Sequence, residues 1–289
     1  MRRGFPKAIA ALAAAIALAA CTHSSDPPPP PPPPPPTADE AARASYARIV
    51  SGANAILFGD QLGYFGSDDD VERVGVRCLV DVCSFGFSRF SRPSGFSVES
   101  VELELLGERR GVSQVVERGS GEYADVHVYG GWLDHSLFAS ESVLLTNDIY
   151  PDKGATVVIS YAVGFSTEEN PSAVDGSARW EGLMIGRDMR ATASRGQVVL
   201  GDADVTVDFA ATALTADVAF TGIANAESGE AWDDMAWRGM AVEEGAFAQS
   251  DAADDTISGR FFGPGEEEVA GAFERGGIAG VFGGRRASD

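Results

Sequence analysis

Hydrophobic and polar residues alternate most regularly near the C-terminal end of the chain, where one pattern occurs three times. The copies are Ile257-x-Gly259-x-Phe261, Val269-x-Gly271-x-Phe273 and Ile278-x-Gly280-x-Phe282. Successive side chains of a strand point to opposite faces, so each copy places a β-branched residue, a glycine and a phenylalanine on one face. Alternation of large and small residues fills the interior of small closed barrels. The pattern therefore predicts bent barrel strands and says little about a ligand.

Similar strand patterns continue upstream and predict a complete barrel. Turns rich in glycine, aspartate and asparagine separate the strands, which is typical of small antiparallel barrels. The expected strands cover 178–186, 204–210, 214–223, 235–242, 245–249, 257–262, 268–274 and 278–284. Most are shorter than the roughly 9–11 residues of a membrane-spanning strand, so we do not expect a membrane barrel. The fold class is mostly all-β, with a C-terminal eight-stranded antiparallel β-barrel over residues 176–286.

A helix is expected before the β-structure begins. Thr37 and Glu40 have the spacing of a capping box, and apolar residues recur at helical spacing over 38–53. This helix begins a β-rich, handle-like region that we assign to residues 38–175.

Within the handle-like region the pattern predicts strands and turns. Residues 101–105 alternate cleanly, 156–163 form an apolar β segment, and 117–122 have the composition of a turn. A strand over 125–138 is expected to break at the Gly130-Gly131 pair.

Residues 1–21 have the pattern of an export signal. Basic residues at positions 2, 3 and 7 precede an apolar run, 8–20, that is too short to span a bilayer as a helix. The run ends in Leu-Ala-Ala-Cys21, which resembles the bacterial lipobox, where cleavage leaves an acylated N-terminal cysteine. Several acyl chains anchor a protein more firmly than one. We expect lipidation at Cys21 and attachment to a membrane; the alternative is an ordinary signal peptide with a chance cysteine.

A proline-rich segment follows the lipobox. Residues 22–37 include an unbroken proline run, 27–36, which as an extended helix spans about 31 Å and acts as a semi-rigid tether. Residue 22 is threonine rather than the aspartate that often signals inner-membrane retention in the lipoproteins it resembles. We therefore expect an outer-membrane, lipid-anchored protein that faces either the cell surface or the periplasm.

The charge of the chain limits its partners. It carries a formal net charge of −21, with 43 acidic and 22 basic residues. Such a chain repels phosphate backbones, so we expect no nucleic-acid partner. A high negative charge also favours solubility and does not by itself require a basic partner.

The two remaining cysteines lie close together. The chain has 3 cysteines, and lipidation of Cys21 leaves Cys78 and Cys83. A lone pair so close in sequence, in an exported protein, predicts a disulfide that closes a short loop.

No catalytic or metal-binding pattern is present in the sequence. The 3 histidines form no HExxH motif, and neither a G-x-S-x-G elbow nor a P-loop occurs. We therefore expect no enzyme, no catalytic residues, no metal and no cofactor.

One aromatic-rich segment is a candidate for binding. Residues 230–237 carry Trp232 and Trp237, and tryptophan is enriched at binding hot spots. Trp237 is expected in the core, while Trp232 lies in the loop proper and is the candidate binding residue.

The C-terminal residues resemble those of a known family. The segments 259–273, GRFFGPGEEEVAGAF, and 280–285, GVFGGR, are similar to the barrel signature of transferrin-binding protein B and its short, single-lobe, solute-binding-like lipoprotein relatives. The resemblance is specific over 257–286 and implies an eight-stranded barrel, a preceding handle region and a lipidated tether. Transferrin-binding protein B has two such lobes, whereas this chain has room for one. Fold does not fix function, so the resemblance does not imply transferrin binding.

Three functions are compatible with these patterns. The first is a non-enzymatic surface protein that presents the barrel to an extracellular or host protein partner. The second is a lipocalin-like binder that holds a small molecule inside the barrel, since eight strands leave room for packed side chains or one small ligand. The third is a structural envelope lipoprotein without a soluble ligand.

Overall fold

The computed structural model describes most of the chain after residue 55. The described residues are 56–58, 61–67, 70–79, 82–85, 91–93, 100–121, 124–146, 156–164, 169–172, 176–190, 196–209, 213–252 and 255–288. The predicted helix over 38–53, the tether and Cys21 lie outside them. All regular elements in the described part are strands, which confirms the all-β class. No helix among these residues has the length and apolar character needed to cross a membrane.

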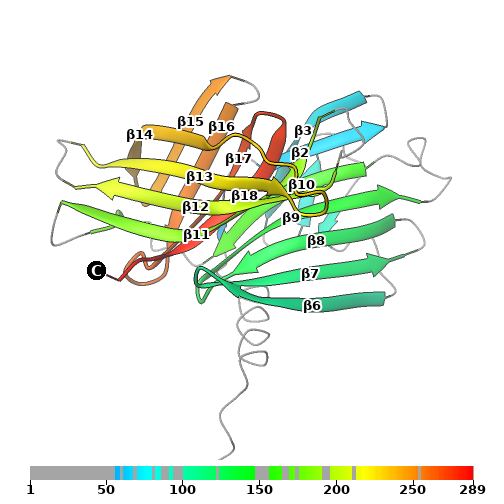
Figure 1. Cartoon of the computed structure of the whole chain (residues 1–289), viewed down its shortest axis with the longest axis horizontal. Coiled ribbons are helices and arrows are strands. Elements are labelled where there is room, and N and C mark those ends of the chain that lie inside the picture. The colour runs from blue at the N-terminus through cyan, green and yellow to red at the C-terminus, as the bar shows by residue number, and fades with distance from the viewer. Residues whose placement is uncertain are drawn as a thin grey trace, which may run out of the picture. The chain divides into compact units, whose positions relative to one another are not determined.

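The first ten strands form an open antiparallel sheet, which we call the handle sheet (Figure 1). They are β1 (Ile56–Phe58), β2 (Gln61–Ser67), β3 (Asp70–Leu79), β4 (Val82–Phe85), β5 (Ser91–Pro93), β6 (Ser100–Arg109), β7 (Val112–Ser120), β8 (Ala124–Trp132), β9 (Ser136–Leu145) and β10 (Thr156–Gly164). Their order is β5-β4-β3-β2-β10-β9-β8-β7-β6, and β1 also pairs with β10. The last strand of the sheet in sequence therefore lies at its centre, between β2 and β9.

The remaining eight strands close into a barrel, as the sequence predicts. They are β11 (Ser177–Asp188), β12 (Val198–Asp208), β13 (Thr215–Asn225), β14 (Met235–Glu243), β15 (Ala246–Ala252), β16 (Asp255–Phe262), β17 (Glu268–Arg275) and β18 (Ile278–Arg286). Each strand pairs with the next, and β18 returns to pair with β11. At this seam Gly182 lies opposite Gly284.

The barrel interior is filled by aromatic and aliphatic side chains. Seven aromatic rings form one continuous series of contacts, with centroids 4.7–6.4 Å apart. The series runs from Trp180 through Phe261, Phe247, Phe282 and Phe220 to Trp237 and Phe273. All seven side chains belong to one buried cluster. Separations of this size are those of favourable tilted and edge-to-face pairs.

The three phenylalanines of the repeated pattern all belong to this interior, and the repeat glycines make room for the rings. A Cβ on Gly259 would lie 2.3 Å from the Phe247 ring, and one on Gly271 would lie 2.6 Å from the Phe282 ring. A Cβ on Gly280 would lie 2.9 Å from the Phe273 ring. A phenylalanine ring of one strand therefore occupies the space that a glycine of another strand leaves open.

The handle sheet packs against the outer face of the barrel strands β11, β16, β17 and β18. A second buried cluster joins Phe138 and Ala162 of the handle to Leu183, Ile185 and Val281 of the barrel. The Phe138 ring lies so close to Gly283 that a Cβ there would be 2.3 Å from it. The outer face of these barrel strands is consequently apolar, which explains why β17 and β18 are buried on both faces.

Two sequence predictions in the handle are wrong. The strand over 125–138 does not break at Gly130-Gly131; β8 continues through both glycines, and the chain turns at 133–135. The glycine there accommodates an aromatic ring, because a Cβ on Gly131 would lie 2.6 Å from Phe138. The turn predicted at 117–122 lies largely within β7, and the chain reverses only between Ser120 and the start of the antiparallel β8 at Ala124. The turn before β7 is at 110–111, where Arg110 has φ 49° and Gly111 has φ 75°.

Candidate functional site

The two ends of the barrel interior are covered by arginine side chains stacked on tryptophans. Arg286 lies over the Trp180 ring at 5.3 Å, and Arg275 lies over the Trp237 ring at 4.0 Å. Trp180 and Trp237 lie at opposite ends of the aromatic series that fills the barrel. A guanidinium held over an indole face at these distances is attracted by the ring quadrupole. The interior is thus packed along its length and covered at both ends.

The end of the barrel at Trp237 also carries Trp232, the candidate from the sequence. Arg190 lies over the Trp232 ring at 3.7 Å from its centroid. The indole is half-buried and packs against the interior cluster. We call Arg190, Trp232 and Glu230 the rim cluster, because they come from the loops that follow β11 and β13.

Carboxylates fix the arginine of the rim cluster. Arg190 Nη2 donates to Asp188 Oδ2 at 2.8 Å and its Nε donates to Oδ1 at 3.0 Å, a bidentate arrangement on a fully buried aspartate. Glu230 is a second carboxylate partner, at 3.5 Å from Nη2. These hydrogen bonds raise the pKa of Arg190 above its ordinary value. The guanidinium is therefore held in place over the indole by contacts within the chain.

A turn built on Asn225 positions the loop that carries Trp232. The Asn225 Oδ1 accepts hydrogen bonds from the backbone N–H of Glu227 and Ser228, each at 2.9 Å. The N–H of Trp232 then donates to the carbonyl of Ile223 at 2.9 Å. Asparagine side chains commonly organise turns in this way.

The second stack at this end, Arg275 on Trp237, repeats the same design. Arg275 makes a bidentate pair with Asp255, at 2.7 Å from Nε and 2.8 Å from Nη2. The Trp237 indole N–H donates to the same Asp255 at 3.0 Å. The hydrogen bond from Arg275 is the main reason that the pKa of Asp255 lies below its ordinary value.

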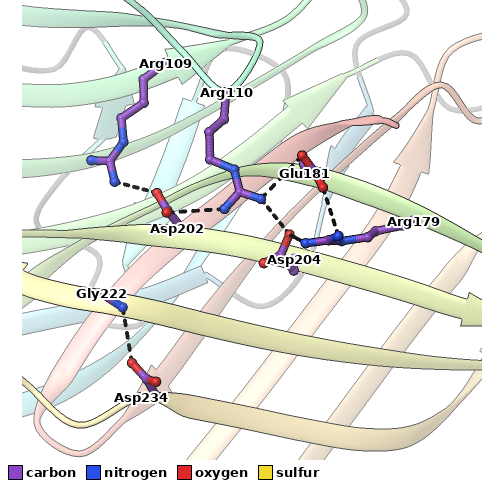
Figure 2. A network of polar contacts seen from close by, with 8 residues as sticks. All are labelled: Arg109, Arg110, Arg179, Glu181, Asp202, Asp204, Gly222 and Asp234. Atoms are coloured by element: carbon purple, nitrogen blue, oxygen red, sulfur yellow. Dashed lines mark hydrogen bonds and ion pairs between the residues drawn. The ribbon is translucent and has the colours of Figure 1, made fainter. Parts of the chain in front are cut away.

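A network of charged side chains joins the handle to the outer face of the barrel (Figure 2). Arg109 and Arg110, at the β6–β7 turn, reach Asp202 and Asp204 on β12. Arg110 Nη2 lies 2.7 Å from Asp204 Oδ1 and Nη1 lies 3.4 Å from Asp202 Oδ2. Arg179 of the neighbouring strand also reaches Asp204, at 2.8 Å. Because these groups are partly exposed, we assign the network a role in orientation and only a small one in stability.

A buried carboxylate holds the β8–β9 turn of the handle. Glu268 is 1% exposed and accepts the backbone N–H groups of Asp134, at 2.7 Å, and His135, at 3.0 Å. It also accepts the Ser136 hydroxyl at 2.7 Å. Burial raises the pKa of Glu268, while these hydrogen bonds act in the opposite direction. Arg285 strengthens the same contact by donating to Asp134 at 2.7 Å.

Glu274, on the outer face of β17, gives the contact region a pH dependence. Burial raises its pKa to about 7. The folded chain then holds this proton at a higher pH than the unfolded chain, so stability falls as pH rises from about 4.5 to 7. Glutamine resembles the protonated acid. After allowance for solvent screening, we expect Glu274→Gln to have a free energy of unfolding about 1 kcal/mol above that of wild type at pH 8. At pH 4.5 we expect little difference between the two. Urea unfolding at both pH values measures this difference; an equal difference at the two pH values contradicts it.

The residues singled out in the sequence do not form one site. Cys21 lies outside the described residues, Cys78 and Cys83 are paired in the backbone register of β3 and β4 in the handle sheet, and Trp232 lies at the barrel rim. Sequence reasoning missed Arg190 and Asp188, whose i, i+2 spacing after a strand offered a weak signal. In the described part of the chain no three His, Cys, Asp or Glu side chains gather as metal ligands would.

The described residues define a protein with one antiparallel barrel, a filled interior and a flanking sheet. No protein-family model matches the sequence, and no curated protein matches it either. Among solved structures, the N-lobe of lactoferrin-binding protein B from Moraxella bovis is similar, with 14% identity and a TM-score of 0.34, covering 65% of this chain and 81% of that one.

Two transferrin-binding proteins B are also similar. The match to the protein from Haemophilus parasuis has 11% identity and a TM-score of 0.36. It covers 80% of this chain and 45% of that protein's chain. The match to the protein from Neisseria meningitidis has 14% identity and a TM-score of 0.35. It covers 80% of this chain and 44% of that protein's chain. This chain therefore spans less than half of either protein. All three belong to the group that the C-terminal motif resembles, and at this level of similarity they indicate nothing about a ligand.

Proposed function

We propose that this chain is a non-enzymatic, lipid-anchored envelope protein that binds an extracellular protein partner through the surface of its barrel. One observation carries the proposal: the interior is packed by a continuous series of rings and covered at both ends by arginine. A lipocalin-like ligand needs an open interior, so the packing favours recognition on the outside. The proposed order is a signal over 1–21, a tether over 22–37, a handle region over 38–175 and the barrel over 176–286.

The rim cluster is the proposed centre of the binding surface. Tryptophan and arginine are the residues most enriched at hot spots, and here both are held by packing and ion pairs before binding. A side chain that is already ordered loses less entropy when a partner docks. The half-buried Trp232 keeps an exposed part of its surface for contact.

Capture of surface or secreted proteins by the purified full chain tests the proposal. We expect a specific partner to be retained by wild type and reduced at least tenfold by Trp232→Ala, as hot-spot losses of about 2 kcal/mol or more imply. Glu243→Ala is the matched control, because Glu243 is exposed and ends β14 at the opposite end of the barrel from the loop that carries Trp232. Failure to retain any partner contradicts protein binding, and equal loss in both variants contradicts the rim as its centre.

Anchoring and orientation are tested separately in cells. We expect metabolic palmitate to label wild type and not Cys21→Ser, and added protease to cleave the chain on intact cells. Labelling of Cys21→Ser contradicts lipidation at this residue. Labelling with full protection from protease places the protein in the periplasm and removes the extracellular partner from the proposal.

We also propose a disulfide between Cys78 and Cys83. The two residues are directly paired across the β3–β4 hairpin. Directly paired residues have Cα atoms about 4.5–5.5 Å apart, which lies within the range that a disulfide spans. We expect no free thiol in the non-reduced mature protein and one in Cys78→Ser. Two free thiols in wild type, measured after unfolding without a reductant, contradict the bond.

A further inference from the structure

Part of the contact between the handle and the barrel is polar. On the barrel-facing side of the handle sheet, residues paired across neighbouring strands form rows. The row that contains Phe138 is apolar, and in the next row Tyr129, Ser140 and Ser160 are direct cross-strand neighbours. Both serines are fully buried. The next row brings His127 opposite Ser142. Buried polar groups are costly unless they are hydrogen-bonded, so this region needs partners.

A buried arginine from the barrel enters this polar region. Arg187, near the end of β11, is 2% exposed. Its Nη2 donates to the carbonyl of His127 at 3.1 Å and to that of Ser140 at 3.3 Å, and its Nη1 donates to the carbonyl of Gly196 at 3.1 Å. All three acceptors are neutral. In the described part of the chain Arg187 forms no ion pair.

Four buried polar atoms of Arg187 and of the handle residues next to it have no hydrogen-bond partner. They are Arg187 Nε, Ser140 Oγ, Ser160 Oγ and His127 Nε2. The atoms are neighbours: Arg187 contacts the backbone of His127 and Ser140, and Ser160 lies directly opposite Ser140. They come from strands of both the handle and the barrel. Four orphaned atoms at one place indicate a shared ligand rather than separate packing defects.

The electrostatics indicate the charge of that ligand. Burial lowers the pKa of Arg187 to about 10, against the weaker opposing effect of the Glu227 charge, so Arg187 stays cationic at neutral pH. Burial, and then the charges of Arg187 and Arg118, lower the pKa of His127 to about 4, which makes this imidazole neutral in a positive environment. A buried cation without an anionic partner is unfavourable. A water molecule would satisfy the orphaned atoms but would leave Glu227, which acts on Arg187 without forming an ion pair with it, to compensate the charge.

We propose that Arg187, Ser140, Ser160 and His127 bind one small monovalent inorganic anion, of the halide class, between the handle and the barrel. A single negative charge matches the single guanidinium. The Arg187 Nε–H and the two hydroxyls donate to the anion, and a neutral imidazole can add a fourth N–H donor. The anion thereby links strands β8, β9 and β10 of the handle to β11 of the barrel.

Bromide provides a direct test because it scatters X-rays anomalously. Crystals of the wild-type full chain grown in sodium bromide are expected to show an anomalous peak in contact with Arg187 Nε and both serine hydroxyls. A water molecule at this position, or bromide bound elsewhere only, overturns the proposal. This measurement needs no variant and therefore does not depend on how substitutions affect folding.

Thermal unfolding in bromide tests the same site in solution. We expect a saturable rise in the unfolding temperature of wild type when sodium bromide replaces sodium gluconate at constant ionic strength, because a ligand of the native state stabilises it. Ser160→Ala removes one hydrogen bond to a charged group. We therefore expect the bromide concentration that gives half of the rise in unfolding temperature to be about tenfold higher in this variant than in wild type.

Ser142→Ala is the matched control. Ser142 lies in the same interface, but its hydroxyl already donates to the His127 carbonyl at 3.4 Å. We expect this variant to keep the bromide dependence of wild type. Absence of a saturable effect in wild type, or the same shift in both serine variants, overturns the site in solution.

Discussion

Phe220→Ala is expected to lower the free energy of unfolding by about 4 kcal/mol, the usual cost of removing a fully buried phenylalanine. Phe220 is 0% exposed and contacts the Phe273, Phe282 and Trp237 rings at 4.7, 5.4 and 5.5 Å. The three rings can close the resulting space only by leaving their preferred arrangement, and Met235, the cross-strand neighbour of Phe220 in the same cluster, can fill only part of it.

Urea unfolding of the full chain measures the loss of Phe220. Phe209→Ala is the control, because Phe209 is only half-buried at the edge of the same cluster and should lose clearly less. A loss below about 1.5 kcal/mol for Phe220→Ala contradicts a tightly packed interior. That result would restore the lipocalin-like alternative, because a loosely packed barrel has room for a ligand.

Gly182→Ala is expected to cost about 3 kcal/mol and to lower the unfolding temperature by about 6–12 °C. A Cβ on Gly182 would lie 1.9 Å from the carbonyl oxygen of Gly283 and 2.4 Å from the Cα of Gly284. Both obstacles are backbone atoms of β18, so neither can rotate away. The added methyl group must push β11 and β18 apart at the seam where the barrel closes.

The control for the seam is Gly265→Ala in the loop between β16 and β17. Its nearest neighbour atom would be 3.9 Å away, on the flexible side chain of Glu267. We expect a change within about 0.5 kcal/mol, as for ordinary surface substitutions. Calorimetry of both variants gives the comparison; similar unfolding temperatures contradict the crowding at Gly182.

The barrel could be predicted from the sequence because its inner face follows a strict rule. The repeated positions Phe261, Phe273 and Phe282 alternate with small residues, and the alternation has the period of a strand. Strand β12 was predicted to begin at residue 204, yet it begins at Val198. Gly201 and Asp202 resemble a turn, but Asp202 faces outward to pair with Arg109, a partner about a hundred residues away that the local pattern does not reveal.

The candidate site was predicted less completely, for a physical reason. Trp232 could be found because tryptophan is rare and stands in a polar loop. Its partner Arg190 could not be found, because stacking depends on the distance between two loops that only the closed barrel brings together. Arg187 was missed for a similar reason: a strand arginine usually faces solvent, and only the docking of the handle buries it.

The pairing of β11 with β18 has a consequence for how the chain acquires its structure during synthesis and export. The barrel seam joins residues about a hundred positions apart, and β10 likewise pairs with β2 across most of the handle. Contacts of such long sequence separation make folding slow, on the order of milliseconds to seconds. A chain that leaves the ribosome or a translocation pore N-terminus first cannot close the barrel until Arg286 has emerged. The outer face of β17 and β18, on which the handle docks, also appears last, so the handle sheet can dock only after these two barrel strands are available.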